Sequence, residues 1–417
     1  MKEKGKILLF RKALIQEGGA ERLIFEAAEW FARFGYETCI VSVKGKEPPE
    51  LFNGIYTNTS VKSFYVGSYP KNLLSKILIS LASIGKLRRE IRSFRPDVML
   101  AQGPADAEML YFASLGLKIP YATFLYSSFF NFPDDGLKYV APFNRAFEKI
   151  MNVTPGHKTF IPFENPVKGF FAGLVLRVRA WINHFVVHRA AYAFSLSNRM
   201  AWENEQFYNR DVIYIKSGID PSLFSYKPKK DMREKYGFPR NSKMLIDVGR
   251  LVPGKRIELC IRTMAELKKK REDVYFVVGG RGPDKERLEE LIDKLGLRSR
   301  AVLAGFVAEE DLSDFYASAS AVFHPAWIDF DLTVMEGLSY GKKIICSTDY
   351  DLSGGLSTLT EKQIFQADPD AVSMANAVER ALNAVPVSNI EIQQTLQDFT
   401  KEASLRNIAS YLFHAAE

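Results

Sequence analysis

The sequence predicts an α/β protein built from two doubly wound parallel sheets, and three features of the chain lead to this prediction. Its 417 residues exceed what one hydrophobic core usually supports, so two domains are expected. Short apolar runs alternate with segments of helical periodicity, which is the pattern of repeated βαβ units. The alternation restarts at Met244, so each half is expected to form a sheet of its own.

The first half contains four apolar runs short enough to be buried strands. They are Ile7–Phe10, Cys39–Val43, Val98–Ala101 and Ala122–Leu125. Continuous apolar runs of this length suit parallel strands that helices cover on both faces. The amphipathic segments Glu21–Phe34 and Asp106–Ser114 are expected to be two of those helices.

The second half repeats the pattern more regularly. Strands are expected at Met244–Val248, Tyr275–Val278, Val302–Leu303, Ala321–Phe323 and Ile344–Cys346. Helices are expected at Arg256–Lys270, Asp284–Leu295, Glu309–Ala317 and Val334–Tyr340. The polar, proline-containing stretch Gly218–Asn241 is the expected join between the halves, and the chain ends in an amphipathic helical stretch, Leu396–Ala416.

Composition narrows the class of protein. The formal charge of +7, from 56 Lys and Arg against 49 Asp and Glu, is a mild excess that suits phosphate-bearing ligands or an anionic membrane surface. No RNA- or DNA-binding signature accompanies it, so nucleic acid is not an expected partner. The cysteines Cys39, Cys260 and Cys346 lie far apart in apolar runs and are expected to be buried free thiols in a reducing compartment.

The chain is expected to be cytoplasmic, or to sit on a membrane from the cytoplasmic side. Residues Met1–Lys6 are charged and lead directly into a strand-like run, which is unlike a secretory signal. No segment has enough uninterrupted apolar residues to span a bilayer.

Two helical segments of the first half, Lys71–Arg92 and Val167–Arg189, combine apolar positions at helical spacing with basic residues. The cations that end the first segment are Lys86, Arg88, Arg89 and Arg92. The second segment adds aromatic residues, and basic amphipathic helices of this kind suit the bilayer interface. The alternative, a core-facing helix with a solvated charged face, is the commoner arrangement and stays open here.

The strongest local signal for chemistry is the run Asp247–Arg256. A strand ends at Val248, a loop with Gly249 follows, and a helix is expected to start near Lys255. The unpaired N–H groups and the positive dipole end of a helix N-terminus favour phosphate. Arg250 and Lys255 add positive charge. The guanidinium of Arg250 offers several N–H donors in one plane, and the ammonium group of Lys255 acts as a point charge. This loop is therefore a candidate diphosphate site, with exposed residues that only solubilise the loop as the alternative.

Two further glycine-bearing turns follow the next strands. Gly279–Pro283 begins where the strand ending at Val278 stops, and Gly305–Val307 follows the strand after that. Glycine lets a ligand approach the backbone closely, although a plain strand-to-helix turn looks the same. Because successive turns of an open parallel sheet lie along its carboxyl edge, where ligands bind, the three turns together favour one site.

The run Phe330–Glu336 is the fourth segment. Glu336 is expected on the first turn of a helix, where its carboxylate is placed to accept hydrogen bonds from ribose hydroxyls while nearby N–H groups face phosphate. A glutamate that only complements the helix dipole is the alternative.

Taken in order, these segments resemble the retaining glycosyltransferases of the GT-B fold, in the large branch that uses nucleotide-diphospho-sugars. The resemblance runs over roughly 210 to 345, including the lead-in Ser217–Asp220. In the first half, Gly18–Arg22 resembles the glycine-rich loop of the family. The resemblance implies two Rossmann-like domains facing across a cleft. They are an acceptor-binding domain, 1–210, and a nucleotide-sugar-binding domain, 211–394, with a C-terminal helix, 395–417, that returns to the first domain.

The resemblance also implies roles for individual residues. Arg250 and Lys255 would hold the diphosphate and stabilise its charge as the glycosidic bond breaks. They would replace the metal ion that other transferases use, so no metal or other cofactor is expected. Glu336 would bind the ribose. The other donor contacts would come from Gly19, Gly249, Gly282, Val307, Asp329, Leu332 and Thr333.

The chain departs from the family pattern at two places. Ile328 stands where members usually have a glutamate that contacts the donor sugar, and either Asp329 or Asp331 is close enough in sequence to supply that carboxylate. The stretch Tyr121–Ser128 lacks the histidine that many members have shortly after a strand of the first domain.

Two other patterns are interpreted as structural. The run Asp349–Asp351 has the shape of a metal-binding aspartate pair, but the family has an ordinary loop there, so a solvated turn is expected. His324, before Pro325, is expected to be a structural histidine at a strand end with its hydrogen bonds satisfied.

The sequence therefore predicts a retaining transferase of mannose or another hexose that acts on a lipid-linked or glycolipid acceptor at a membrane surface. Two alternatives from other classes stay open. One is a sugar-nucleotide epimerase of similar layout, and the other is a catalytically impaired partner of an active transferase.

Overall fold

The computed structural model describes residues 4–14, 19–45, 61–65, 73–126, 146, 149–150, 170–326 and 332–414. The chain divides into two compact units. Unit 1 takes in the described residues up to Ile215 and those from Ser404 onward, and unit 2 is Lys216–Ala403. The stretch Gly218–Asn241 is not a join but part of unit 2, because Phe224, Met232 and Phe238 are buried in that unit's core.

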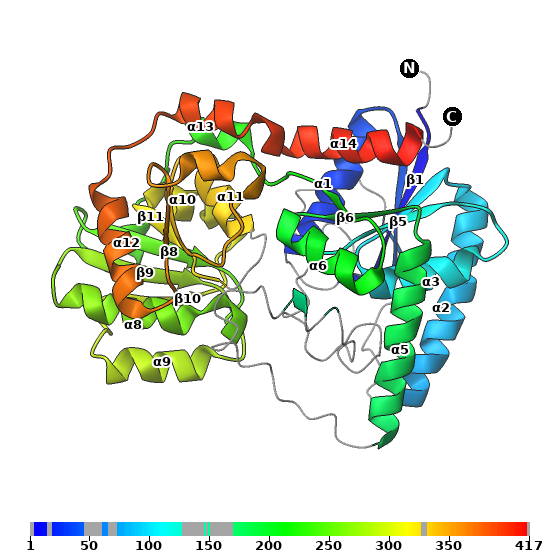
Figure 1. The fold of residues 1–417 in the computed structure, drawn as a ribbon, viewed down its shortest axis with the longest axis horizontal. Helices are drawn as coiled ribbons and strands as arrows, with labels where there is room; N and C mark the ends of the chain where they lie inside the picture. Colours follow the sequence, from blue (N-terminus) through cyan, green and yellow to red (C-terminus); the bar gives the residue numbers. More distant parts are fainter. Residues whose placement is uncertain are drawn as a thin grey trace. The chain divides into compact units, whose positions relative to one another are not determined.

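Unit 1 contains a seven-stranded parallel sheet in the order β3-β2-β1-β4-β5-β6-β7. Figure 1 labels three of its strands, β1, β5 and β6. Its strands are β1 (Lys6–Leu14), β2 (Glu37–Gly45), β3 (Val61–Tyr65), β4 (Val98–Ala101), β5 (Tyr121–Phe124), β6 (Tyr192–Ser195) and β7 (Ile213–Tyr214). Strand β1 lies between β2 and β4, with Ile7 opposite Thr38 of β2 on one side and Val98 of β4 on the other. The four strands predicted in this half are confirmed, and β3, β6 and β7 are additions.

The helices of unit 1 are α1 (Gly19–Arg33), α2 (Leu73–Phe94), α3 (Pro104–Ser114), α5 (Phe170–Arg189) and α6 (Asn198–Tyr208). The last helix, α14 (Lys401–His414), ends in unit 1, where Phe413 packs on Tyr36 with ring centroids 4.6 Å apart and Tyr411 packs on Tyr192 at 5.6 Å. The predicted helices Glu21–Phe34 and Asp106–Ser114 are confirmed as α1 and α3.

Unit 2 contains a six-stranded parallel sheet in the order β10-β9-β8-β11-β12-β13. Its strands are β8 (Lys243–Val248), β9 (Val274–Gly279), β10 (Ala301–Gly305), β11 (Ala321–Phe323), β12 (Lys343–Ser347) and β13 (Ile364–Ala367). All five strands predicted in this half are confirmed, and β13 is an addition.

The helices of unit 2 cover both faces of its sheet (Figure 1). They are α7 (Met232–Lys235), α8 (Ile257–Lys268), α9 (Lys285–Lys294), α10 (Glu309–Ser318), α11 (Leu332–Ser339), α12 (Ala371–Asn383) and α13 (Asn389–Thr395). Short 3-10 helices lie at Pro221–Ser225, Pro253–Lys255, Ser353–Leu359 and Gln397–Phe399. The four predicted helices are confirmed as α8, α9, α10 and α11.

Strand β8 shows why a continuous apolar run suits this sheet. Met244 and Ile246 belong to the hydrophobic cluster on one face, and Leu245 between them belongs to the cluster on the other. Successive side chains of a strand point to opposite faces, so a strand covered by helices on both sides is apolar at every position.

The cysteines are confirmed as buried free thiols, and burial raises the pKa of Cys39 to about 11. Within the described ranges, no helix is long and apolar enough to cross a membrane.

Candidate functional site

The turns that follow β8, β9 and β10 are joined to one another at the carboxyl edge of the unit 2 sheet. The amide of Gly249 donates to the carbonyl of Gly279 at 2.9 Å, and the amide of Gly280 donates to the carbonyl of Gly305 at 2.7 Å. The three glycine-bearing turns expected to share this edge therefore lie side by side.

Two of the glycines are required by the packing of these turns. A Cβ added to Gly280 would lie 1.7 Å from the carbonyl oxygen of Gly249, and one added to Gly282 would lie 2.2 Å from that of Leu251. The opposing atoms are backbone, which has no rotamer to change, so no side chain fits at either position. Backbone packing on backbone thus explains both glycines without a ligand, and a donor contact at Gly282 stays a prediction.

The two cations predicted to hold a diphosphate border this edge. Arg250 is exposed, and its guanidinium makes no hydrogen bond or ion pair with any residue that the structure describes. Lys255 is half-buried at the end of the 3-10 helix Pro253–Lys255. Its Cδ and Cε lie 4.0 Å from the position that a Cβ of Gly249 would take, so its stem lies across the turn after β8.

Arg256 has a role that the sequence did not reveal. Its backbone is left-handed, with φ of 51°, and its Nη1 donates to Asp349 at 2.5 Å, to the hydroxyl of Ser347 at 3.3 Å and to the carbonyl of Pro325 at 3.4 Å. The Asp349 side chain is 1% exposed. The expectation of a solvated turn is therefore wrong for Asp349, which is the buried partner of an arginine that contacts the ends of β11 and β12.

A second buried pair lies directly before the Gly249 turn. Nδ1 of His324, after β11, is 2.5 Å from Oδ1 of Asp247 in β8, and both side chains are fully buried. The expected structural histidine is confirmed. The other carboxylate oxygen of Asp247 has no hydrogen-bond partner among the described residues.

Helix α11 brings Thr333 and Glu336 to the same edge. The Thr333 hydroxyl donates to the carbonyl of Val248 at the end of β8, and Glu336 accepts a hydrogen bond of 2.7 Å from the buried hydroxyl of Tyr316. The helix begins at Leu332, so Glu336 is its fifth residue and lies beyond the first turn, contrary to expectation. A role in complementing the helix dipole is correspondingly weak, because that effect fades within the first turn.

The remaining predicted donor contacts are spread over both units. Val307 packs on the turn after β9, with Cγ2 2.7 Å from the position of a Cβ on Gly279. Leu332 is half-buried, and Gly19 is the first residue of α1 in unit 1. Asp329 lies outside the described residues, as do Ile328 and Asp331.

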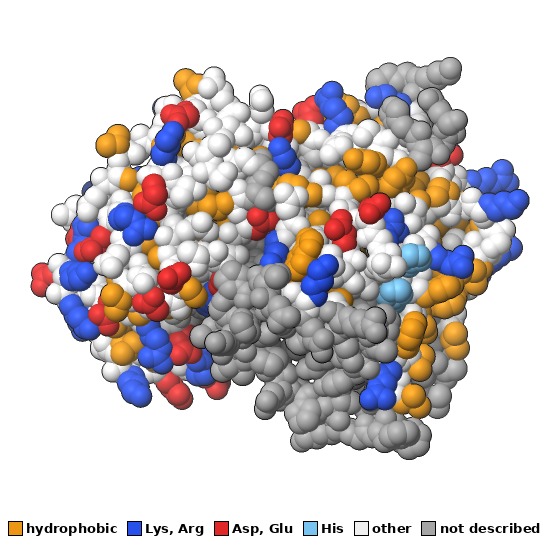
Figure 2. Space-filling model, in the orientation of Figure 1, with side chains coloured by type: hydrophobic (Ala, Val, Ile, Leu, Met, Phe, Trp, Pro, Cys, Tyr) orange, Lys and Arg blue, Asp and Glu red, His pale blue; other side chains and the backbone are white. Residues whose placement is uncertain are grey.

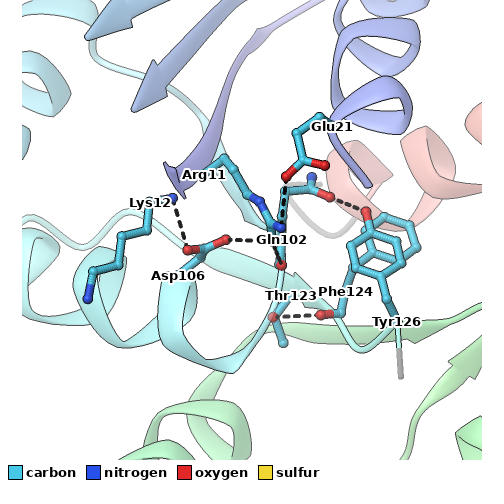
Figure 3. Close-up of polar contacts among 8 residues, drawn as sticks. All are labelled: Arg11, Lys12, Glu21, Gln102, Asp106, Thr123, Phe124 and Tyr126. Carbon is cyan, nitrogen blue, oxygen red and sulfur yellow. Dashed lines mark hydrogen bonds and ion pairs between the residues drawn. The ribbon is translucent and has the colours of Figure 1, made fainter. Parts of the chain in front are cut away.

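Unit 1 has a polar cluster at the carboxyl edge of its own sheet, which sequence reasoning missed (Figure 3). Arg11 of β1 donates to the carbonyl of Gln102 at 2.8 Å, to Glu21 of α1 at 3.1 Å and to Asp106 of α3 at 3.4 Å. The hydroxyl of Tyr126, after β5, donates to the Gln102 side chain. Burial raises the pKa of Asp106, and the charge of Arg11 acts in the opposite direction.

The cluster lies where the strand order of unit 1 reverses, because β1 and β4 are neighbours in the sheet but not in the sequence. Ligands of doubly wound sheets bind at this reversal. Glu21 belongs to the glycine-rich segment Gly18–Arg22, and Tyr126 to the stretch Tyr121–Ser128 that lacks the histidine of the family. Arg11 lies in β1, Gln102 and Asp106 follow β4, and Tyr126 follows β5, and these residues share no motif.

The basic residues predicted to face a membrane lie on α2. Lys86, Arg89 and Arg92 are exposed, whereas Leu87 on the same helix is buried. Arg88 differs from its neighbours, because its Nη1 donates to the carbonyls of Ala113 at 2.9 Å and Leu115 at 2.7 Å at the end of α3. Arg88 thus has a structural role in joining α2 to α3.

Two family models match the chain and together cover most of it. The model described as Glycosyltransferase Family 4 matches residues 17–223, and the one described as Glycosyl transferases group 1 matches residues 228–397. The chain belongs to family 4 of the glycosyltransferases.

Individual relatives show how far the similarity extends. An uncharacterised glycosyltransferase of Methanocaldococcus jannaschii is 30% identical over 208 residues, which are 48% of this chain and 51% of the relative. One component of the human phosphatidylinositol N-acetylglucosaminyltransferase is 24% identical over 48% of this chain and 39% of its own. The GDP-mannose-dependent α-(1-6)-phosphatidylinositol monomannoside mannosyltransferase of Mycolicibacterium smegmatis is 28% identical over 27% and 30%.

The chain thus matches about half the length of these curated relatives, or less. Among solved structures, sucrose-phosphate synthase from Thermosynechococcus elongatus matches 99% of this chain and 100% of its own, with a TM-score of 0.72 and 16% identity. At that identity the likeness shows the fold alone, which is the GT-B fold expected from the sequence.

Proposed function

We propose that this family 4 chain transfers a hexose from a nucleotide-diphospho-sugar to an acceptor hydroxyl, with retention of configuration at the anomeric carbon. The observation that carries the proposal is the edge of unit 2 where Arg250 and Lys255 border the turn at Gly249. The diphosphate leaving group gains negative charge as its bond to the sugar breaks, and fixed cations stabilise that charge. These cations supply the charge stabilisation that a metal ion would otherwise provide, so we propose a reaction without a metal cofactor.

In this proposal the other residues of the edge bind the nucleoside part of the donor. Glu336 accepts hydrogen bonds from the ribose while Tyr316 holds its carboxylate in place. The backbone at Leu332 and Thr333 approaches the phosphates, and the backbone near Val307 meets the base. Gly19, Gly249 and Gly282 offer close backbone approach, and Asp329 is assigned to the donor sugar.

We further propose that unit 1 binds the acceptor and that the acceptor is linked to a lipid. The names of the human and mycobacterial relatives specify phosphatidylinositol and a phosphatidylinositol mannoside, and the second specifies GDP-mannose as the donor. The exposed cations Lys86, Arg89 and Arg92 of α2 suit the anionic surface where such acceptors lie. The chain would then act as a peripheral protein on the cytoplasmic face of a membrane.

The donor site is tested by thermal stabilisation of the full chain with UDP, GDP, ADP and their hexose derivatives, with and without EDTA. A ligand that binds the native state raises the apparent stability by mass action. We expect one base to raise the melting temperature with and without EDTA, and Arg250→Ala and Lys255→Ala to abolish the shift. Arg298→Ala is the matched control, because Arg298 is an exposed arginine of unit 2 paired with Asp293. No shift with any nucleotide would contradict the proposal.

Product analysis separates the transferase from the alternative classes. Incubation with the stabilising donor and a lipid extract is expected to give a glycosylated lipid with the donor's anomeric configuration. A new sugar nucleotide formed from the donor alone would show an epimerase. Donor binding without turnover in any extract would show an inactive binding protein.

A further inference from the structure

Helix α5 of unit 1 carries an apolar stripe on its exposed face. Leu174, Val178, Trp181 and Phe185 are 48%, 52%, 53% and 43% exposed. They follow one another at intervals of four, three and four residues, so they share one side of the helix. Figure 2 shows hydrophobic side chains gathered along this helix with Lys and Arg beside them. Scattered apolar residues are normal on a protein surface, but a contiguous patch marks an interaction site.

The remainder of α5 is held in unit 1, so the stripe is not the core face of a loosely attached helix. Val186 and Val187 are fully buried. The hydroxyl of Tyr121 donates to the carbonyl of Val186, and Nη1 of Arg210 donates to the carbonyls of Val187 at 2.8 Å and Ala190 at 2.6 Å. The buried side of the helix is thus already occupied, and the stripe points to a partner outside the chain.

The charges around the stripe show what kind of partner fits it. Arg177 and Arg189 are exposed beside the stripe, and the guanidinium of Arg189 lies over the ring of Phe185 at 4.8 Å. The sequence of α5 contains no Asp or Glu. An apolar strip flanked by Arg177 and Arg189 complements a surface that is apolar inside and negatively charged outside, as an anionic bilayer is.

Neighbouring α2 extends the same surface. Helix α3 packs against both α2 and α5, which brings the two basic helices together on one face of unit 1 (Figure 1). Helix α2 exposes Leu81, at 61%, together with the cations Lys86, Arg89 and Arg92. Its one acidic residue, Glu90, is paired with Lys62 at 2.8 Å.

The length of α5 places the stripe near the edge where unit 1 has its polar cluster. Its 20 residues span about 30 Å, whereas the four residues of β6 span about 13 Å. The helix leads into the start of β6, so its N-terminal half, with Leu174 and Val178, extends past the carboxyl edge of the sheet (Figure 1).

We propose that α5 docks this protein on an anionic lipid bilayer, with Leu174, Val178, Trp181 and Phe185 inserted among the acyl chains and Arg177 and Arg189 at the headgroup phosphates. The inference deepens the lipid-linked acceptor proposed above by naming the surface and its lipid chemistry. The role of docking in catalysis rests on that proposed function. Docking itself does not, because binding to a bilayer requires neither a bound donor nor catalytic turnover.

The test is flotation of the full chain with vesicles of phosphatidylcholine alone and with about one third phosphatidylglycerol. We expect binding to the anionic vesicles that falls at least tenfold in the double variant Val178→Gln/Trp181→Gln, since these are the most exposed residues of the stripe. The matched control is Val372→Gln/Val385→Gln, which removes two valines of unit 2 that are 56% and 84% exposed, and it should bind like the wild type. Arg177→Glu should weaken binding to anionic vesicles more than binding to neutral ones.

Insertion has its own readout, because Trp181 reports on its surroundings. Lipids brominated on the acyl chain should quench part of the fluorescence of the bound wild type. In Trp181→Phe that part should disappear while flotation persists. The double variant Val178→Gln/Trp181→Gln is called the stripe variant. Equal vesicle binding of the wild type and the stripe variant, with circular dichroism showing that both are folded, would overturn the proposal. So would a dimer in solution that the stripe variant dissociates, since the occupant would then be a second copy.

Nucleotide binding separates this inference from the donor proposal. The stripe variant should keep the wild-type nucleotide shift, because its changes lie in unit 1 and the proposed donor cations lie in unit 2. Loss of docking with the shift intact supports the inference, whereas docking without any nucleotide shift contradicts only the proposed function.

Discussion

Removing the carboxylate of Asp349 should destabilise unit 2 far more than the loss of an ordinary ion pair. The side chains of Asp349 and its partner Arg256 are 1% and 15% exposed. In Asp349→Ala the Arg256 guanidinium loses its contact to Asp349 at 2.5 Å and keeps the longer ones to Ser347 and Pro325, at 3.3 and 3.4 Å. Leaving a buried charge without its partner typically costs about 3–5 kcal/mol. Because Arg256 is partly exposed, we expect a loss near the lower end, about 3 kcal/mol.

Urea denaturation followed by circular dichroism measures this loss, and a thermal melt gives a second reading. For a unit of this size each kcal/mol shifts the melting temperature by roughly 2–4 °C, so a fall of about 6–12 °C is expected. Asp293→Ala is the matched control, because the Asp293–Arg298 pair has side chains 49% and 65% exposed. Exposed pairs of this kind contribute about 0–1 kcal/mol.

The double variant Arg256→Met/Asp349→Leu tests the physical reason directly. Replacing both charges with apolar side chains removes the unpaired charge, so most of the lost stability should return. A loss in Asp349→Ala no larger than in Asp293→Ala, or a double variant less stable than Asp349→Ala, would refute the reasoning from burial.

Three further outcomes are expected for residues of unit 2. Gly280→Ala should raise the calorimetric dissociation constant for nucleotide at least tenfold, because its Cβ would lie 1.7 Å from the carbonyl oxygen of Gly249. The control Gly85→Ala, in α2, should leave that constant unchanged, because no atom lies within 4 Å of its added Cβ. Tyr316→Phe removes the hydrogen bond to Glu336 and should weaken nucleotide binding severalfold. The control Tyr340→Phe should not weaken it, because the Tyr340 hydroxyl donates to Ser313. Equal effects of the two variants would argue against Glu336 as a donor contact. Burial lowers the pKa of Lys342 to about 8, so the unfolded chain binds the extra proton between pH 8 and the ordinary value of 10.5. The wild type should therefore gain stability relative to Lys342→Met as the pH rises through this window, by up to about 1.4 kcal/mol per pH unit. Urea midpoints that change with pH in the same way for the two proteins would contradict this prediction.

The positions of the strands and of the glycine turns follow from the sequence alone. Runs such as Val98–Ala101 and Ala321–Phe323 are apolar at every position, and only a strand covered on both faces requires that pattern over so short a length. The turns at Gly249, Gly280 and Gly305 follow successive strands, and parallel topology then brings them to one edge. Local periodicity and topology therefore suffice for the fold and for the outline of the candidate donor edge.

The partners of charged side chains depend on the tertiary structure. Arg256 meets Asp349 across 93 positions of the chain, and Arg11 meets Asp106 across 95. Neither pair has a sequence signature, because an arginine carries the same local pattern whether it is solvated or buried against a carboxylate. For this reason Asp349 was expected in a solvated turn, and the unit 1 cluster was not expected at all.

The same limit applies to α5. Its sequence shows basic and aromatic residues at helical spacing, which fits both a core-facing helix and an interfacial one. Tyr121, Arg210 and helix α3 contact α5 and determine which of its sides is covered. All three lie outside the sequence of α5. Periodicity determines that side chains share a face, but only the packed neighbours determine whether that face is exposed to solvent.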